Sequence, residues 1–208
     1  MNKNQRSWAM NRRFSSPFTR PSGVLGRLAG RLMLRTNMHD QQDVLEVLDI
    51  QPGDRVLEVG YGPGGLLRLL ADRTEAALIQ GVDPSPEMCR AAAETIRGVK
   101  HADRVLLRRG TADGTGLDDQ SVDWAVSVNN VAIWHNLEAG LRELHRVVRT
   151  GGTVLIAWHG GFSPGRTARG LQMTQEQLGR IHHQLESLFA DVTRSQLRSL
   201  DVFTAVRH

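Results

Sequence analysis

The sequence predicts an α/β fold with a doubly wound, mostly parallel sheet of seven strands and helices on both faces. Between residues 54 and 189, short apolar runs rich in β-branched residues alternate with segments of helical periodicity. The runs are apolar throughout, which is typical of parallel strands buried on both faces. Two strand-like runs close the chain with no helix between them, which predicts a C-terminal antiparallel hairpin.

The expected elements are assigned from periodicity and from helix-boundary residues. Ser85 is expected to cap a helix whose first residue is Pro86, and Gly98 to end it. The five parallel strands are expected at 54–60, 77–83, 104–110, 122–130 and 153–159, and the hairpin strands at 191–198 and 200–207. Helices are expected at 64–73, 86–98, 137–149 and 174–189, with two more before the first strand, within 22–34 and 38–50.

The 208 residues fit one domain, expected at 23–208, after a basic flexible arm at 1–22. Hydrophobic residues make up 40% and charged residues 23%, as in ordinary globular proteins. Cys89 is the only cysteine, which excludes an internal disulfide and a multi-cysteine zinc site. No His, Cys and acid grouping has convincing metal spacing, so no metal is expected. The absence of a secretory signal and of a long apolar run favours a cytoplasmic protein.

Charge is distributed unevenly along the chain. Residues 1–39 contain eight basic residues and no acid, whereas the remaining residues contain 18 basic and 22 acidic ones. Three roles are open for the basic region: a lid over a pocket, a contact of residues 1–35 with an anionic membrane surface, and a contact with nucleic-acid phosphates. Nucleic acid is the least favoured partner, because no RNA-binding module is found.

The stretch VLEVGYGPGG places a glycine loop between the first strand and the first helix of the sheet. Gly60, Gly62 and Gly65 satisfy G-x-G-x-x-G, and Asp83 ends the next strand, where a carboxylate can hold ribose hydroxyls. Both NAD and S-adenosylmethionine (SAM) fit this spacing. Glu58, inside the strand, favours SAM, because its carboxylate would repel a pyrophosphate and attract an amino group. The loop also lacks a basic or hydroxyl side chain, and the hairpin leaves no separate substrate domain.

These motifs together resemble a known family. VLEVGYGPGG, GVDPSPEM, RRGTAD, SVDWAVSVNNVAIWH and LRELHRVVRTGGTVLIAW are similar, in order and spacing, to the class I SAM-dependent methyltransferases. The overall pattern is similar to the small bacterial ubiquinone/menaquinone-biosynthesis-like branch. The resemblance implies a Rossmann-like fold and SAM as cofactor.

The resemblance also implies which residues bind SAM. The loop from Glu58 to Gly64 would hold the methionine and ribose, and Asp83 the ribose hydroxyls. Family members generally have an acid at the position of Thr111, so either Thr111 would accept the hydrogen bond there or Asp113 would substitute for the acid. The implied cofactor-binding residues are Glu58, Gly60, Tyr61, Gly62, Gly64, Asp83, Pro84, Met88, Thr111, Ala112, Asp113 and Asn129.

Candidate catalytic residues follow the fourth and fifth strands. His135 and His159 lie at the expected ligand edge, where a histidine could act as a base for a phenol or alcohol. Asn130 ends the fourth strand near the expected methyl group. Trp134 and Trp158 accompany the histidines and are either core residues or an aromatic wall for the acceptor.

The sequence therefore predicts a SAM-dependent methyltransferase that acts on a small, apolar or aromatic metabolite. The alternatives are a methyltransferase of quinones or lipid head groups located peripherally at the membrane, and a SAM-binding protein without catalysis. The acceptor atom and the oligomeric state are left open.

Overall fold

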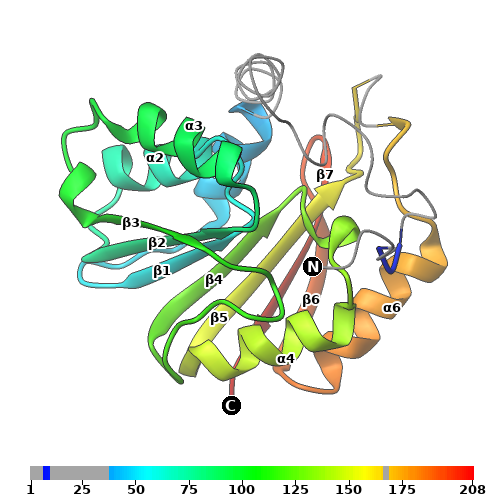
Figure 1. Cartoon of the computed structure of the whole chain (residues 1–208). Helices are drawn as coiled ribbons and strands as arrows, with labels where there is room; N and C mark the ends of the chain where they lie inside the picture. Colours follow the sequence, from blue (N-terminus) through cyan, green and yellow to red (C-terminus); the bar gives the residue numbers. More distant parts are fainter. Residues whose placement is uncertain (1–6, 10–37, 166–168) are drawn as a thin grey trace.

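The computed structural model describes residues 7–9, 38–165 and 169–208, and these form a single seven-stranded sheet with helices on both sides (Figure 1). The strand order is β3-β2-β1-β4-β5-β7-β6. The strands are β1 Arg55–Val59, β2 Leu78–Asp83, β3 Val105–Arg109, β4 Val122–Val128, β5 Val148–His159, β6 Ala190–Gln196 and β7 Leu200–Val206.

The direction of the strands confirms the expected fold class. β1 to β5 pair in parallel, whereas β7 pairs antiparallel with both β5 and β6. The chain order reverses at β1, whose neighbours are β2 and β4, so β1 lies at the topological switch point of the sheet. Ligands of open α/β sheets bind at this point, beyond the carboxyl ends of the strands.

Helices cover the two faces as separate layers (Figure 1). A helical segment at 38–47 packs with α2 and α3 on one face, and α4 and α6 pack on the other. Each face has its own apolar cluster, and the sheet separates them. The helices are α2 Gly65–Arg73, α3 Pro86–Ile96, α4 Leu137–Val147 and α6 Gln175–Glu186.

Side-chain caps explain where three helices begin. The Ser85 hydroxyl accepts a hydrogen bond from the Met88 amide, and Pro86 follows as the first helical residue, as expected. The Asn136 side chain caps α4 in the same way. Thr174 and Gln177 form a reciprocal capping box at the start of α6.

The boundary between α4 and β5 differs from the expectation. The helix expected to reach residue 149 ends at Val147, because Val148 already pairs with Val122 of β4 as the first residue of β5. A register shift between Val122 and Trp124 then accommodates the glycine turn inside β5. The expected helix within 22–34, and most of the expected arm at 1–22, lie outside the described residues.

Residues 7–9 are described and pack against the face that carries α6. The Trp8 indole donates a hydrogen bond to the Val131 carbonyl (2.7 Å), and the guanidinium of Arg180 lies 5.4 Å from the centre of its ring. The side chain of Gln177 donates to the Ala9 carbonyl (2.8 Å). These contacts attach the start of the chain beside the turn that follows β4.

Two glycine substitutions test the packing between β2 and the glycine loop. A Cβ at Gly81 would lie 2.5 Å from Cδ1 of Tyr61 and 2.8 Å from Cδ1 of Leu67, so Gly81→Ala is expected to lower the free energy of unfolding by about 1–3 kcal/mol. Gly179→Ala on α6 meets no atom within 4 Å and is expected to raise it by about 0.5–1 kcal/mol. Urea unfolding measures both. Equal changes in the two variants would contradict this packing.

Candidate functional site

Three glycines of the loop between β1 and α2 have positive φ, each with different surroundings. At Gly60 (φ 74°) a Cβ would collide with the Asn130 side chain, and at Gly64 (φ 81°) it would lie 3.0 Å from Ala92. At Gly62 (φ 52°) it would meet no atom within 4 Å. The bare backbone of Gly62 therefore faces open space at the switch point, where a ligand can approach it.

Asp83 ends β2 and holds the loop in place. Its Oδ2 accepts a hydrogen bond from the Gly62 amide (3.0 Å), and its Oδ1 accepts one from the Ser85 amide (2.8 Å). Burial raises the pKa of Asp83, and these two amides oppose the rise. Each carboxylate oxygen can accept a second hydrogen bond, so the group can still bind hydroxyls of a ligand.

Glu58 lies inside β1 with only 2% of its surface exposed. Its Oε2 has no hydrogen-bond partner among the described residues. Burial, and then the charge of Asp83, raise the pKa of Glu58 to about 8, although the Leu67 amide lowers it in part. A cation or a hydrogen-bond donor placed beside this carboxyl would relieve the cost of its burial.

The end of β4 connects the glycine loop to the fifth strand. The Asn130 side chain packs against Gly60 and accepts a hydrogen bond from the Trp134 indole (2.6 Å). Asn129 (φ 52°) donates from its side chain to Asp40 (2.9 Å). Nδ1 of His159, at the end of β5, lies 3.9 Å from Oδ2 of Asp40.

The structure thus brings together most of the residues expected at the site. Glu58, Asp83, Asn129 and Asn130 gather with the three glycines of the loop at the carboxyl ends of β1, β2 and β4. His159 joins them from β5.

The side chains expected near the adenine have mixed environments. Pro84 and Asp113 are exposed, whereas Met88 and Ala112 are buried. Thr111 pairs through its backbone with Gly114 in a tight turn after β3. This turn follows the strand next to β2, so it lies further along the same edge from Asp83.

Three other side chains lie elsewhere. Tyr61 is 1% exposed, its ring packs on Gly81, and its hydroxyl donates to Sγ of Cys89 (2.8 Å), so only its backbone belongs to the loop. Trp134 and Trp158 are buried in the apolar cluster on the α4 and α6 face, which is the core environment rather than an open aromatic wall. His135 is exposed in the turn between β4 and α4.

The sequence interpretation missed the residues that reach the site from outside the parallel strands. Asp40 and Gln41 of the helical segment are each 7% exposed; Gln41 fills the space beside Gly65, and Ser199 donates its hydroxyl to Asp40. One signal was available: Asp40, Val44 and Leu48 are spaced by four residues and share the buried face of that segment.

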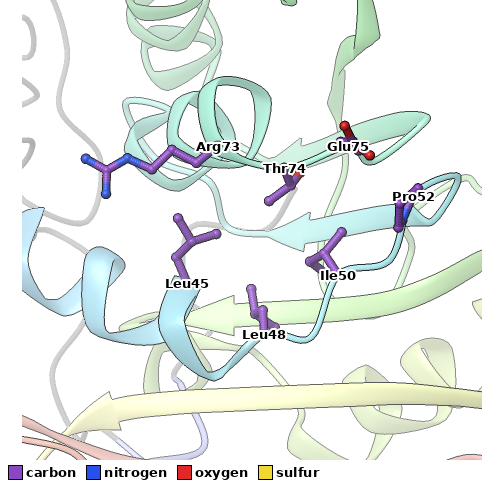
Figure 2. A pocket seen from close by; sticks show the side chains of 7 residues that line it. All are labelled: Leu45, Leu48, Ile50, Pro52, Arg73, Thr74 and Glu75. Carbon is purple, nitrogen blue, oxygen red and sulfur yellow. The ribbon is translucent and has the colours of Figure 1, made fainter.

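A hollow of about 300 Å³ lies at the other end of β1 (Figure 2). Pro52, just before β1, and Thr74, just after α2, place it away from the glycine loop, and it contains none of the expected site residues. Its lining consists of Leu45, Leu48, Ile50, Pro52, Arg73, Thr74 and Glu75.

The described residues were also compared with the requirements of metal sites and of membrane-spanning helices. They contain no group of three or more His, Cys, Asp or Glu side chains able to hold a metal ion. Within the same ranges, no helix is both long enough and apolar enough to cross a bilayer.

Comparisons with known proteins identify the family. The family model described as "Methyltransferase domain" matches residues 56–152. An uncharacterized methyltransferase of Bacillus subtilis, YdaC, is 30% identical over 129 residues, which cover 62% of this chain and 69% of that protein. The ubiquinone/menaquinone biosynthesis C-methyltransferase UbiE of Geobacter sp. is 31% identical over 49% of this chain, which spans 44% of that relative.

Solved structures share the fold. A SAM-dependent methyltransferase structure from Methanococcus maripaludis superposes with a TM-score of 0.71 at 18% identity, covering 87% of this chain and 93% of that one. The family match decides between the two adenosine ligands in favour of SAM. The chain belongs to the class I SAM-dependent methyltransferases.

Proposed function

We propose that this enzyme transfers the methyl group of SAM to a small, apolar or aromatic metabolite. The observation that carries the proposal is that two different sets of residues lie at the carboxyl ends of the parallel strands. Gly62, Asp83 and Glu58 form a polar cradle at the ends of β1 and β2, and a different set of residues surrounds the ends of β4 and β5. The cradle would hold the cofactor, and the adjoining strand ends would hold the acceptor.

The order of the strands supports one direction for SAM along this edge. Asp83 would bind the ribose hydroxyls, and the turn that contains Thr111, beyond β3, would lie at the adenine together with Met88 and Pro84. The methionine amino group would approach Glu58 on the other side of the ribose. The methyl group would then point toward β4 and β5, where Asn129 and Asn130 end the fourth strand.

Exposed apolar side chains at the acceptor end support an apolar substrate. Phe162, three residues after β5, is 71% exposed, and Met38, two residues before Asp40, is 47% exposed. Exposed large apolar side chains next to a ligand site are typical of apolar binding surfaces. The amide of Phe162 donates to the Leu197 carbonyl (3.2 Å), which ties its loop to the hairpin.

A methyltransferase of a quinone or lipid head group at the membrane surface is the second candidate. Two relatives favour it by name: UbiE, and a phosphatidylethanolamine N-methyltransferase of Cereibacter sphaeroides that is 34% identical over 51% of this chain. The basic residues expected to contact the membrane, within 1–35, lie outside the described residues. Activity that depends on vesicles of anionic lipid would favour this candidate over the first.

The raised pKa of Glu58 predicts that cofactor binding depends on pH. With a pKa near 8, most Glu58 carboxyls are protonated at pH 7, and a bound amino group would favour the ionised form. Binding would then release a proton, so the affinity for S-adenosylhomocysteine is expected to rise between about pH 6 and 8, by up to about tenfold per pH unit. Calorimetric titration measures the affinity and the proton release.

Glu58→Gln removes this titration, so its affinity should vary much less with pH. Glu94→Gln on the exposed face of α3 should behave like the wild type and serves as the matched control. In the ligand-free protein, the stability of the fold changes with pH in the opposite direction to the affinity. Folded Glu58 retains its proton where the unfolded chain loses it, so stability falls as the pH rises from about 4.5 to 8, by at most about 1.4 kcal/mol per unit.

Gly62→Ala tests whether the cofactor occupies the open side of the loop. The methyl group meets no protein atom, so the variant should fold with a stability loss of about 1–2 kcal/mol from its positive φ. A ligand that fills this space would be displaced, and the affinity for S-adenosylhomocysteine should fall at least about tenfold. Gly53→Ala has positive φ and open space at the opposite end of β1, and should keep full affinity. Equal affinities in the two variants would place the ligand elsewhere.

The acceptor class is tested with SAM that carries a radiolabelled methyl group. The enzyme is added to an extract of its source organism, and the label is partitioned between organic, aqueous, lipid, protein and nucleic-acid fractions. Label in the organic small-molecule fraction is the expected result. Label in lipid favours the second candidate, and label only in protein or nucleic acid contradicts both.

A further inference from the structure

A buried carboxylate from outside the parallel strands reaches the acceptor end of the site. Asp40 accepts hydrogen bonds from the side chains of Asn129, at the end of β4, and Ser199, in the hairpin between β6 and β7. Only 7% of Asp40 is exposed, so its burial is costly unless it serves an interaction. The two donors engage different oxygens and hold the carboxylate in one orientation.

The imidazole of His159 lies beside this carboxylate. Its side chain is 13% exposed, and Nδ1 lies 3.9 Å from Oδ2 of Asp40. Nδ1 is buried without a hydrogen-bond partner among the described residues, whereas Nε2 is not among the buried unpaired atoms. The ring also packs edge-on against Trp158, with centroids 5.2 Å apart, which limits its rotation.

We propose that His159 accepts the proton of a hydroxyl group on the acceptor during methyl transfer, and that Asp40 positions and stabilises the protonated ring. The enzyme would then be an O-methyltransferase of a phenol, enol or alcohol. This inference rests on the proposed function, since it places the acceptor over the ends of β4 and β5. Nδ1 faces Asp40, and Nε2 is the nitrogen that would receive the proton.

The step balances without another reactant. A lone pair of the acceptor oxygen forms a bond to the methyl carbon, and the bond from that carbon to sulfur breaks. Its electron pair remains on sulfur, so the sulfonium becomes the neutral thioether of S-adenosylhomocysteine. The hydroxyl proton moves to His159, and it is returned to water after the products leave.

The electrostatics of the pair suit a base. Burial lowers the pKa of His159, and the charge of Asp40 opposes the change, so the ring is neutral and able to accept a proton near pH 7. Once protonated, the ring forms a neutral ion pair with Asp40. The separation of 3.9 Å must shorten by about 1 Å for a hydrogen bond, and such contacts commonly tighten when the substrate is bound.

Asp40 is the carboxylate available to His159, because the neighbouring Asp201 already has other partners. Asp201 on β7 is another acid next to this end of β5, and it packs against Gly160. Asp201 already accepts hydrogen bonds from the guanidinium of Arg194 (3.1 Å) and from the side-chain amide of Gln196 (3.1 Å).

The need for a base selects the acceptor. A neutral amine or a thiolate can attack the sulfonium methyl without giving up a proton first, and a carboxylate is already ionised at pH 7. A hydroxyl group has a high pKa and gains most from a base in the transition state. A buried histidine and carboxylate at the acceptor end are therefore what a hydroxyl substrate requires.

The acceptor atom can be tested without identifying the acceptor. Labelled small molecules from the extract reaction are heated with hydriodic acid, which releases the methyl group of an ether as volatile methyl iodide and leaves methyl groups on carbon. A parallel sample is treated with alkali, which releases methanol from methyl esters. The expected label is volatile in hydriodic acid and stable in alkali. Small-molecule label in carbon-methyl, N-methyl or ester form would overturn this inference and leave the proposed function standing.

The residues are tested by initial rates of transfer to the same extract. His159→Gln is expected to lower the rate by about 100-fold or more, with the affinity for S-adenosylhomocysteine unchanged. Asp40→Asn should lower it about tenfold and move the acidic limb of the pH profile to lower pH, because Asp40 raises the pKa of His159. The controls are Asp43→Asn on the same helical segment and His183→Gln on the exposed side of α6, which should match the wild type.

Chemical rescue separates catalysis from support of the fold. Added imidazole should restore part of the rate of His159→Ala, which a merely structural role for His159 would not allow. A full rate in His159→Gln, or no rescue of a folded His159→Ala, overturns the inference. Absence of label in every fraction, from enzyme that binds S-adenosylhomocysteine, would contradict the proposed function and this inference together.

Discussion

The hydrogen bond from the Gly62 amide to Asp83 is the contact on which the ligand edge depends. It joins the loop after β1 to the end of β2 across 21 residues of sequence, at the point where the strand order reverses. The amide of Gly60 adds a second tie, to the Val82 carbonyl (2.8 Å), and the side chain of Asn130 packs against Gly60 from β4. A loop of glycines is entropically costly to order. Contacts from both neighbouring strands fix it in the one conformation that leaves Gly62 bare.

The same edge holds two buried acids, of which Glu58 has an oxygen without a hydrogen-bond partner among the described residues. Glu58 and Asp83 are both more than nine-tenths buried, and burial together with the charge of Asp83 makes ionisation of Glu58 harder. Such an arrangement lowers the stability of the ligand-free protein at neutral pH. A cationic cofactor that carries an amino group and ribose hydroxyls supplies the missing charge and donors. The cost of burying Glu58 is therefore consistent with binding, since stability is lost in the ligand-free state and regained in the complex.

Sequence patterns predicted the part of the site whose residues lie close together in the sequence. The seven strands, their C-terminal hairpin, the Ser85 cap and the location of the glycine loop and Asp83 at one edge of the sheet follow from periodicity and from the geometry of parallel sheets. Contacts between distant segments could not be predicted in this way: Asp40 lies 89 residues from Asn129 and 159 from Ser199. Tyr61 shows a second limit, since a loop position indicates exposure, but the missing side chain of Gly81 creates the space that buries its ring.

The family model matches one part of the proposed site and not the other. The matched family region, residues 56–152, contains Glu58, Asp83 and Asn129, but ends before His159 and begins after Asp40. The half that we propose for the cofactor is thus built from β1, β2 and the turns beside them, whereas the half that we propose for the acceptor combines the helical segment at 38–47, the end of β5 and the hairpin. These elements contact the proposed cofactor half through Asn129 and Asn130, and also through Gln41, which fills the space beside Gly65. The two residues that we propose for the chemistry of the acceptor, Asp40 and His159, thus lie outside the region that the family model matches.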